Sequence, residues 1–216
     1  MNDNIIVRAL ESGIVRAADI PSVFAEAGIE YARLSCLNWP DAFPYMPEVR
    51  YAIAHSGDVL YIHYKVCEDS VKGEFDADFS NVWEDSCCEL FISPSDDGKY
   101  YNLECNCIGA LYFCVGEGRS ERRRIPETLM ACIDRYSSFG RRSIGRRCGL
   151  QCWELALKVP AAAFFEHDIK MAGAAMKANI YKCGKTEHNH FVSCFPITTE
   201  NPDFHRPEFF GNIIFE

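Results

Sequence analysis

The chain has 216 residues, a formal net charge of −9 and an isoelectric point near 5.2. This length fits one domain over residues 1–216, which can bury a full hydrophobic core without added staples. The acidic balance argues against nucleic-acid or anionic-membrane partners, and no segment approaches the ~20 apolar residues that cross a bilayer.

The first elements are predicted to be one strand and one short helix. Residues 5–16 mix apolar and charged side chains and predict an edge strand. Residues 18–28 predict a helix that Asp19 can cap, Pro21 can begin and Gly28 can end. These early residues lack the uninterrupted apolar core of a signal peptide, so we expect a cytoplasmic protein.

An extended loop and two strands follow. Three prolines and three aromatic residues over 36–47 predict a loop, and residues 49–55 and 59–68 have the rhythm of paired strands. Residues 69–81 are predicted to form a polar loop.

The most informative stretch, residues 82–108, predicts a β-hairpin around a turn at 93–99. Its strands are rich in aromatic and β-branched residues, and its turn contains Pro, Asp and Gly. Because side chains alternate along a strand, one face is apolar and predicts core packing. The other face either meets water or holds a polar ligand, since it carries Trp83, Asp85, Cys87, Glu89, Phe91, Asn102, Glu104 and Asn106.

The remaining chain continues as short strands with one further short helix. Strands are predicted over 110–116, 151–160, 178–184, 190–197 and 212–216, and a helix over 161–168. Many short strands with only two brief helices predict an all-β fold, a two-sheet antiparallel β-sandwich of immunoglobulin-like or jelly-roll-like kind.

Residues 115–150 are locally basic. They contain nine arginines, no lysine and four acidic residues, a local charge of +9 − 4 = +5. An anion-binding patch is one interpretation. We favour basic hairpin ends that face an acidic body, because few aromatic residues are interleaved for stacking on nucleic acid.

The twelve cysteines do not have the spacing of a zinc site or a disulfide framework, since no Cys-x-x-Cys pair occurs. Most occupy positions where a strand would place Val or Ala, namely Cys36, Cys67, Cys88, Cys105, Cys107, Cys114 and Cys194. We therefore expect reduced core thiols in a reducing compartment. A secreted form with a few bridges is the alternative.

Searches for catalytic motifs find no Gly-x-Ser-x-Gly elbow, no phosphate-binding loop and no His-Glu-x-x-His pair. Glu89 and Glu104 are two carboxylates of the kind that glycosidases use, so a degenerate hydrolase is one hypothesis. If they are neighbours, their repulsion raises a pKa unless a cation or a ligand hydroxyl intervenes.

Four segments together resemble a known family: VWEDSCCELFI, YYNLECNCIG, the Trp153 strand followed by VPAAAFF, and the end PDFHRPEFFGNIIFE. They are similar to the family 9 carbohydrate-binding modules, within the DOMON-like β-sandwiches, and more closely to the stand-alone family 9-like proteins of Bacteroidetes bacteria. The resemblance runs from about Trp39 to the last residue. It implies a non-catalytic domain that holds a mono- or oligosaccharide between aromatic side chains.

The resemblance also implies a site. Trp83 matches the first clamp aromatic, Glu89 a hydrogen-bonding carboxylate and Asn106 an amide on the next strand, while Glu104 stands where better-known members have Arg. The second clamp is expected in the loop of Phe204 and His205. The predicted ligand-binding residues are Trp83, Glu89, Glu104, Asn106, Arg119, His190, Phe204 and His205, with Trp39 and Tyr45 at the rim.

Two bound groups are further hypotheses. The family's sugar modules carry structural calcium, to which Asp76, Asp78 and Asp85 would contribute oxygens, although their spacing is no calcium loop. DOMON relatives include haem-binding electron-transfer domains. For that alternative the candidate iron ligands are Met171 or Met176 with His190 or His205, and the colour of the protein separates the two functions.

Overall fold

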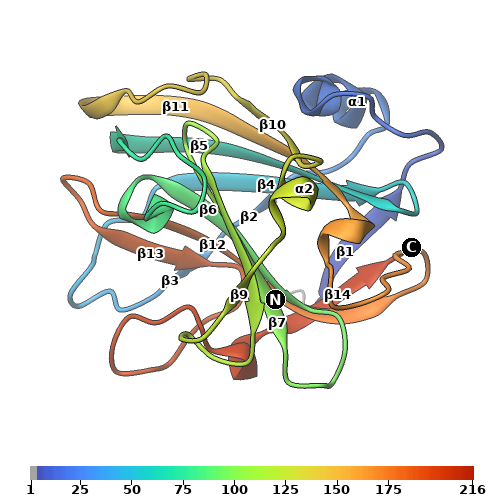
Figure 1. Cartoon of the computed structure of the whole chain (residues 1–216). Helices are drawn as coiled ribbons and strands as arrows, with labels where there is room; N and C mark the ends of the chain where they lie inside the picture. The colour runs from blue at the N-terminus through green and yellow to red at the C-terminus, as the bar shows by residue number, and fades with distance from the viewer. Residues whose placement is uncertain (1–3) are drawn as a thin grey trace.

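The computed structural model describes residues 4–216, whose strands form one continuous, mostly antiparallel sheet that folds into two layers packed face to face, called sheet A and sheet B here. Sheet A is ordered β14-β12-β6-β7-β8-β9, and sheet B is ordered β10-β11-β5-β4 (Figure 1). Sheet A consists of β6 (Cys87–Ser93), β7 (Tyr100–Asn106), β8 (Leu111–Gly116), β9 (Arg123–Arg124), β12 (Ala175–Gly184), β13 (His190–Ser193), β14 (Gly211–Phe215) and the short β3 (Cys36–Leu37). Sheet B consists of β4 (Glu48–His55), β5 (Val59–Gly73), β10 (Asp134–Ser137), β11 (Gly145–Pro160) and the short β2 (Ala32–Arg33). The predicted antiparallel β-sandwich is confirmed.

The helices are few and short. The predicted N-terminal helix is present as η1 (Ala17–Asp19) followed by α1 (Ile20–Glu26), with Gly28 at a positive φ of 63°. The others are η2 (Val82–Glu84), α2 (Glu127–Met130), η3 (Ala161–Ala163) and η4 (Pro207–Phe209). None of the helices within residues 4–216 has the length and apolar character that a membrane span requires.

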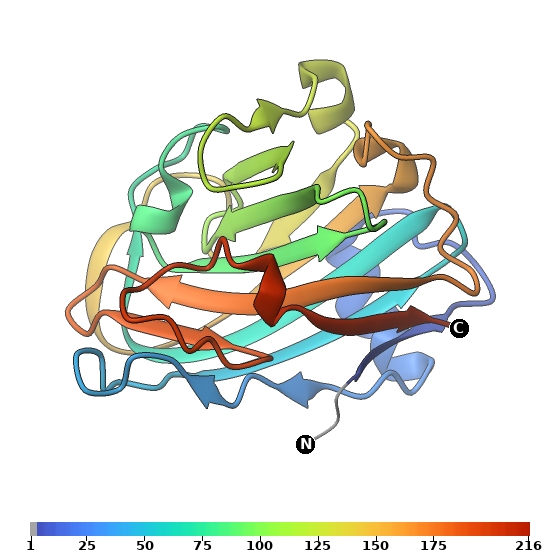
Figure 2. The same ribbon diagram turned by 90° about the horizontal axis from the view of Figure 1, so that it is seen from below.

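Strand β1 (Asn4–Ala9) joins the two sheets and is not the edge strand that its mixed sequence predicts. It pairs in parallel with β14 through residues 4–7 and with β4 through Arg8 and Ala9. Ile5 and Val7 belong to the core cluster, whereas the alternate residues are exposed, so one face of the strand is buried. Figure 2 shows β1, in blue, beside β14, in dark red.

The core lies between the two sheets. Ile62 and Leu155 of sheet B pack in one cluster with Leu90, Leu103 and other apolar residues of sheet A. Their burial supplies the main stabilisation of the fold.

The central hairpin has the predicted alternation. Leu90 pairs with Leu103 on the core face, and Glu89 pairs with Glu104 on the opposite face. The predicted strand start is wrong, however, because Trp83 lies on η2 and β6 begins only at Cys87. Between them Asp85 accepts hydrogen bonds from the backbone N–H groups of Glu74 and Phe75, which turns the chain before the strand.

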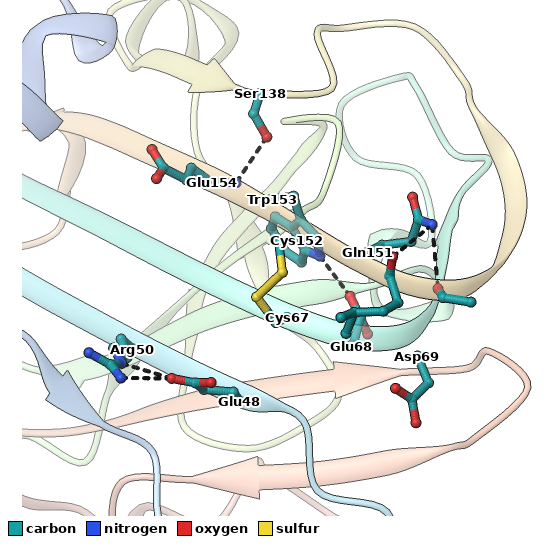
Figure 3. The surroundings of a disulfide bond; sticks show 12 residues. Glu48, Arg50, Cys67, Glu68, Asp69, Ser138, Gln151, Cys152, Trp153 and Glu154 are labelled. Atoms are coloured by element: carbon teal, nitrogen blue, oxygen red, sulfur yellow. Dashed lines mark hydrogen bonds and ion pairs between the residues drawn. A yellow bond between two sulfur atoms is a disulfide. The ribbon is translucent and has the colours of Figure 1, made fainter.

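The long strands β5 and β11 hold one disulfide, Cys67–Cys152 (Figure 3). The two residues are register partners with Cα atoms 4.2 Å apart, so the expectation that all cysteines are reduced is wrong for this pair. A separation of 85 residues leaves no local signal for it in the sequence. Because β11 supplies partners as far as Gly73, β5 also extends into the segment predicted to be a polar loop.

The arginine-rich segment faces acidic residues of the same chain, as expected. Arg135 is 2.6 Å from Asp78, and Arg123 is 3.0 Å from Glu166. These two arginines therefore connect separate segments of the chain through ion pairs.

Candidate functional site

A pocket of about 410 Å³ lies on the outer face of sheet A, on the side away from the core. Residues of β6, β7 and β12 form its floor, because alternate side chains of these strands point outward: Glu89, Phe91, Asn102, Glu104 and Cys183. Trp83 on η2 and the segments 119–122 and 202–205 complete the walls.

The floor is acidic. Glu89 and Glu104 are directly opposite each other on β6 and β7, with exposed fractions of 2% and 4%. Burial, with the adjacent Cys183 and Glu104 next in effect, raises the pKa of Glu89 well above its usual value. Burial also raises the pKa of Glu104 to about 7, against the lowering effects of Asn102, Arg122 and Arg119. Carboxyl groups in this state can both donate and accept hydrogen bonds near neutral pH.

Each carboxyl group has one partner in the floor. Glu104 Oε1 accepts a hydrogen bond of 2.7 Å from Asn102 Nδ2, and Glu89 Oε1 accepts one of 3.2 Å from the Cys183 thiol. These bonds fix the orientation of both carboxyl groups toward the pocket.

The walls are aromatic. Trp83 is half-buried and packs edge to face against Tyr112, with ring centroids 5.2 Å apart. Phe204 stacks on Tyr181 at 4.2 Å and meets Phe191 edge to face at 5.8 Å. The pocket therefore offers ring surfaces from both η2 and the segment 191–205.

Two arginines approach the acidic floor. Arg122, which sequence reasoning missed, donates to Asn102 Oδ1 at 2.8 Å and to the Tyr100 carbonyl at 2.7 Å, and its guanidinium lies 4.2 Å from the centre of the Tyr100 ring. Arg119 was predicted, and its side chain is 72% exposed with one nitrogen 4.0 Å from Asp203.

Six of the eight predicted ligand-binding residues line this pocket: Trp83, Glu89, Glu104, Arg119, Phe204 and His205. Ten further residues line it. Sequence analysis placed two of them, Phe91 and Asn102, on this face of the hairpin without assigning them to the site, and it did not identify Glu84, Tyr112, Arg122, Cys183, Lys185, Phe191, Pro202 and Asp203. Strand alternation is the signal that places Asn102 on the same face as Glu104, two residues away. Arg122 follows a turn and gives no such signal.

Asn106, one of the two others, lies outside the pocket. Its amide nitrogen donates to the Phe75 carbonyl at 2.7 Å and to Asp85 Oδ2 at 2.8 Å, while its oxygen accepts from the Ala110 N–H at 2.9 Å. The side chain is fully buried. Asn106 thus connects three loops, and its role in the structure is different from the one predicted.

His190, the other, belongs to a buried charged cluster. Lys182 Nζ is 2.7 Å from His190 Nε2 and 3.0 Å from Glu68 Oε2. Glu68 Oε1 also accepts from the Trp153 indole at 2.8 Å, a contact drawn in Figure 3. Burial, followed by the charge of Lys182, lowers the pKa of His190 well below its usual value. Neutral His190 therefore accepts from Lys182 through Nε2 and donates through Nδ1 to the His188 carbonyl.

The two predicted rim residues also lie outside the pocket. Tyr45 packs against the rings of His188 and His190, and its hydroxyl accepts from the Asp69 N–H. Trp39 packs edge to face on Phe191 and donates to the Thr199 carbonyl at 2.6 Å, so it supports the wall from behind.

The residues considered for calcium do not form a metal site. Asp78 is paired with Arg135, and Asp85 Oδ2 accepts three hydrogen bonds from protein donors. Within the described part of the chain, no group of three or more His, Cys, Asp or Glu side chains is arranged to hold a metal ion.

The residues considered for haem do not fit an axial pair either. Met171 and Met176 are in the core between the sheets, whereas His205 packs on Phe91 and Tyr100 at the outer face. Both ring nitrogens of His190 already have hydrogen-bond partners.

Comparison with known proteins assigns the family. The family model described as carbohydrate-binding family 9 matches residues 18–215, so the chain belongs to this family. Because the modules of this family are non-catalytic, the chain is a binding protein and the hydrolase hypothesis is wrong. No curated protein sequence matches the chain.

Solved structures agree with this assignment. A crystal structure of a candidate carbohydrate-binding protein from Bacteroides uniformis is 39% identical, covers 99% of each chain and has a TM-score of 0.94. Two structures of a family 9 module from Caldicellulosiruptor kristjanssonii, in complex with glucose and with cellotriose, have TM-scores of 0.66 and 0.61. They cover 99% of this chain and 95% and 93% of theirs, and at 9% identity they show the shared fold.

Proposed function

We propose that the pocket on sheet A binds a saccharide, with Trp83 and Phe204 as the aromatic contacts and Glu89 and Glu104 as the hydroxyl-binding groups. The observation that carries this proposal is the placement of two buried carboxyl groups beneath aromatic walls in one pocket. Aromatic faces cover the C–H surface of a pyranose, and carboxyl groups exchange hydrogen bonds with its hydroxyls.

The size and polarity of the pocket support a small ligand. Its volume of about 410 Å³ falls within the ~300–1,000 Å³ of small-molecule sites. The family assignment supports a sugar, and the related modules from Caldicellulosiruptor kristjanssonii were solved with glucose and with cellotriose.

The test is calorimetric titration with a panel of mono- and oligosaccharides, each with and without calcium. We expect saturable binding by the native protein and a loss of about tenfold or more in affinity for Trp83→Ala. The matched control is Tyr31→Ala, because Tyr31 is also a half-buried aromatic residue but packs on His63 of sheet B. The proposal fails if the folded native protein binds no sugar, or if the two variants lose affinity equally.

A further inference from the structure

The two carboxyl groups of the pocket floor have no basic partner. Among residues 4–216, no Lys, Arg or His nitrogen lies within 4.0 Å of a carboxylate oxygen of Glu89 or Glu104. Buried acidic groups are normally paired or bound to a cation. The floor thus holds two acidic groups that no basic side chain contacts directly.

The basic side chains of the pocket are already bound elsewhere. Arg122 donates to Asn102, to the Gly118 carbonyl and to the Tyr100 carbonyl. Lys185 forms an ion pair with Glu84, and Arg119 points toward Asp203. In this arrangement no basic side chain of the pocket contacts the floor carboxyl groups, so a cationic ligand can supply that contact.

Each carboxyl group also keeps one oxygen for a ligand. Oε1 of Glu89 and Oε1 of Glu104 accept from Cys183 and Asn102, whereas Oε2 of each has no donor among the described residues. Neither Oε2 atom is completely buried, and both residues line the pocket, so a ligand in the pocket can reach both oxygens. Two free acceptor oxygens on adjacent strands suit a donor with several N–H groups.

Resting on the proposed function, we propose that the preferred ligand is a saccharide with a free amino group, whose ammonium binds between Glu89 and Glu104. An ammonium supplies three donors and a positive charge, which favours the ionised form of the two carboxyl groups and makes its hydrogen bonds to them charge-assisted. Calcium fits this floor less well, because it needs six to eight oxygen ligands and the floor presents two carboxyl groups.

The experiment compares matched sugars by calorimetry near pH 7. Glucose, galactose and mannose are each titrated beside the 2-amino-2-deoxy sugar and its N-acetyl derivative, which keeps the nitrogen but loses the charge. We expect at least one amino sugar to bind about ten- to a hundredfold more tightly than its neutral and N-acetyl counterparts.

Isosteric variants test whether Glu89 and Glu104 cause the preference for the amino sugar. Glu89→Gln and Glu104→Gln should each reduce the preference for the amino sugar by about tenfold, with the neutral sugar less affected. Glu48→Gln is the matched control, because Glu48 is exposed on sheet B, and it should leave the preference unchanged. Thermal unfolding of each variant verifies that it is folded.

Each outcome bears on a different claim. If neutral sugars bind and no amino sugar gains affinity, this inference is overturned and the saccharide site stands. If no sugar binds, both are overturned. Saturable binding of calcium chloride alone that Glu104→Gln removes would also overturn the amino-sugar assignment.

Discussion

The ring of Phe204 lies nearly parallel to that of Tyr181, with centroids 4.2 Å apart and planes inclined by 11°. The Tyr181 hydroxyl donates to the Phe204 carbonyl at 3.3 Å, so the same pair makes a polar contact as well. Since Tyr181 is on β12 and Phe204 is in a loop, the contact fastens one wall of the pocket to its floor.

We expect this stacking to be measurable in a double-mutant cycle. Phe204→Leu and Tyr181→Leu keep an apolar side chain but remove the ring pair, so the cycle should give a coupling free energy of about 0.5–1.5 kcal/mol. The measurement is urea unfolding of the native protein, both single variants and the double variant. Strictly additive losses would show that the loop is held by other contacts.

Asn106 should matter for stability rather than for sugar binding. Asn106→Ala leaves the Phe75 carbonyl and the Ala110 N–H without their partner in a buried site. We expect the free energy of unfolding to fall by about 2–4 kcal/mol, measured by urea titration. Asn189→Ala, at an exposed turn, is the control and should change it little. A variant with native stability but no sugar binding would contradict this assignment.

The ion pair between Lys182 and Glu68 predicts that removing one partner destabilises the protein more than removing both charges. Both side chains are fully buried, and although burial lowers the pKa of Lys182, Glu68 and nearby groups raise it overall. Lys182→Met alone should destabilise the protein by about 3–5 kcal/mol, because it leaves Glu68 as a buried unpaired charge.

Removing the charge of Glu68 as well should restore part of the stability that Lys182→Met loses. We expect the double variant Lys182→Met/Glu68→Gln to unfold at a higher urea concentration than Lys182→Met. If the double variant is the less stable of the two, the loss arises from packing and the charge argument is wrong.

Glu104 should make stability fall as pH rises. Its pKa is raised from 4.5 to about 7 in the folded protein, chiefly by burial. The folded state therefore holds the proton more tightly than the unfolded chain. Its stabilisation is present in full below about pH 4.5 and is lost as pH rises through about 7, a change on the order of 3 kcal/mol.

Comparison with a neutral variant isolates this effect. Glu89, Arg119, Arg122 and His205 also surround the pocket floor, and His205, whose pKa burial lowers to about 3, has the opposite pH dependence. Between pH 5 and pH 8 the native protein should lose unfolding free energy that Glu104→Gln keeps. We therefore expect the variant to become more stable relative to the native protein as pH rises. A difference that stays constant with pH would mean that Glu104 is ionised throughout.

Local alternation predicted what depends on local sequence. Leu90 and Leu103 were placed in the core and Glu89 and Glu104 on the other face, because a strand's period of two decides this within a few residues. The part of the pocket floor on the hairpin was therefore predicted from the sequence, whereas the role of Trp83 and Phe204 as aromatic walls came only from the family resemblance.

Contacts between residues far apart in the chain could not be predicted from the sequence. A polar residue on a strand can face a ligand or satisfy a buried loop, and nothing local separates Glu104 from Asn106 in this respect. The partner of Lys182 is Glu68, 114 residues away. The mixed sequence of β1 predicted an edge strand, and its pairing with β14 at the other end of the chain gave no local signal. These features depend on which strands meet, which composition does not encode.

The parallel pairing of β1 with β14 places a constraint on the order of folding. Residues 4–7 cannot pair with sheet A until residues 212–215 have been synthesised. Until then, β1 can pair only with β4, and β12 lacks the neighbour that β14 provides. On the ribosome, the pairing of β1 with β14 is therefore a late event, with the large loop-closure cost of distant contacts. Premature release or truncation before Gly211 would leave an open sheet edge that is prone to pair with other chains.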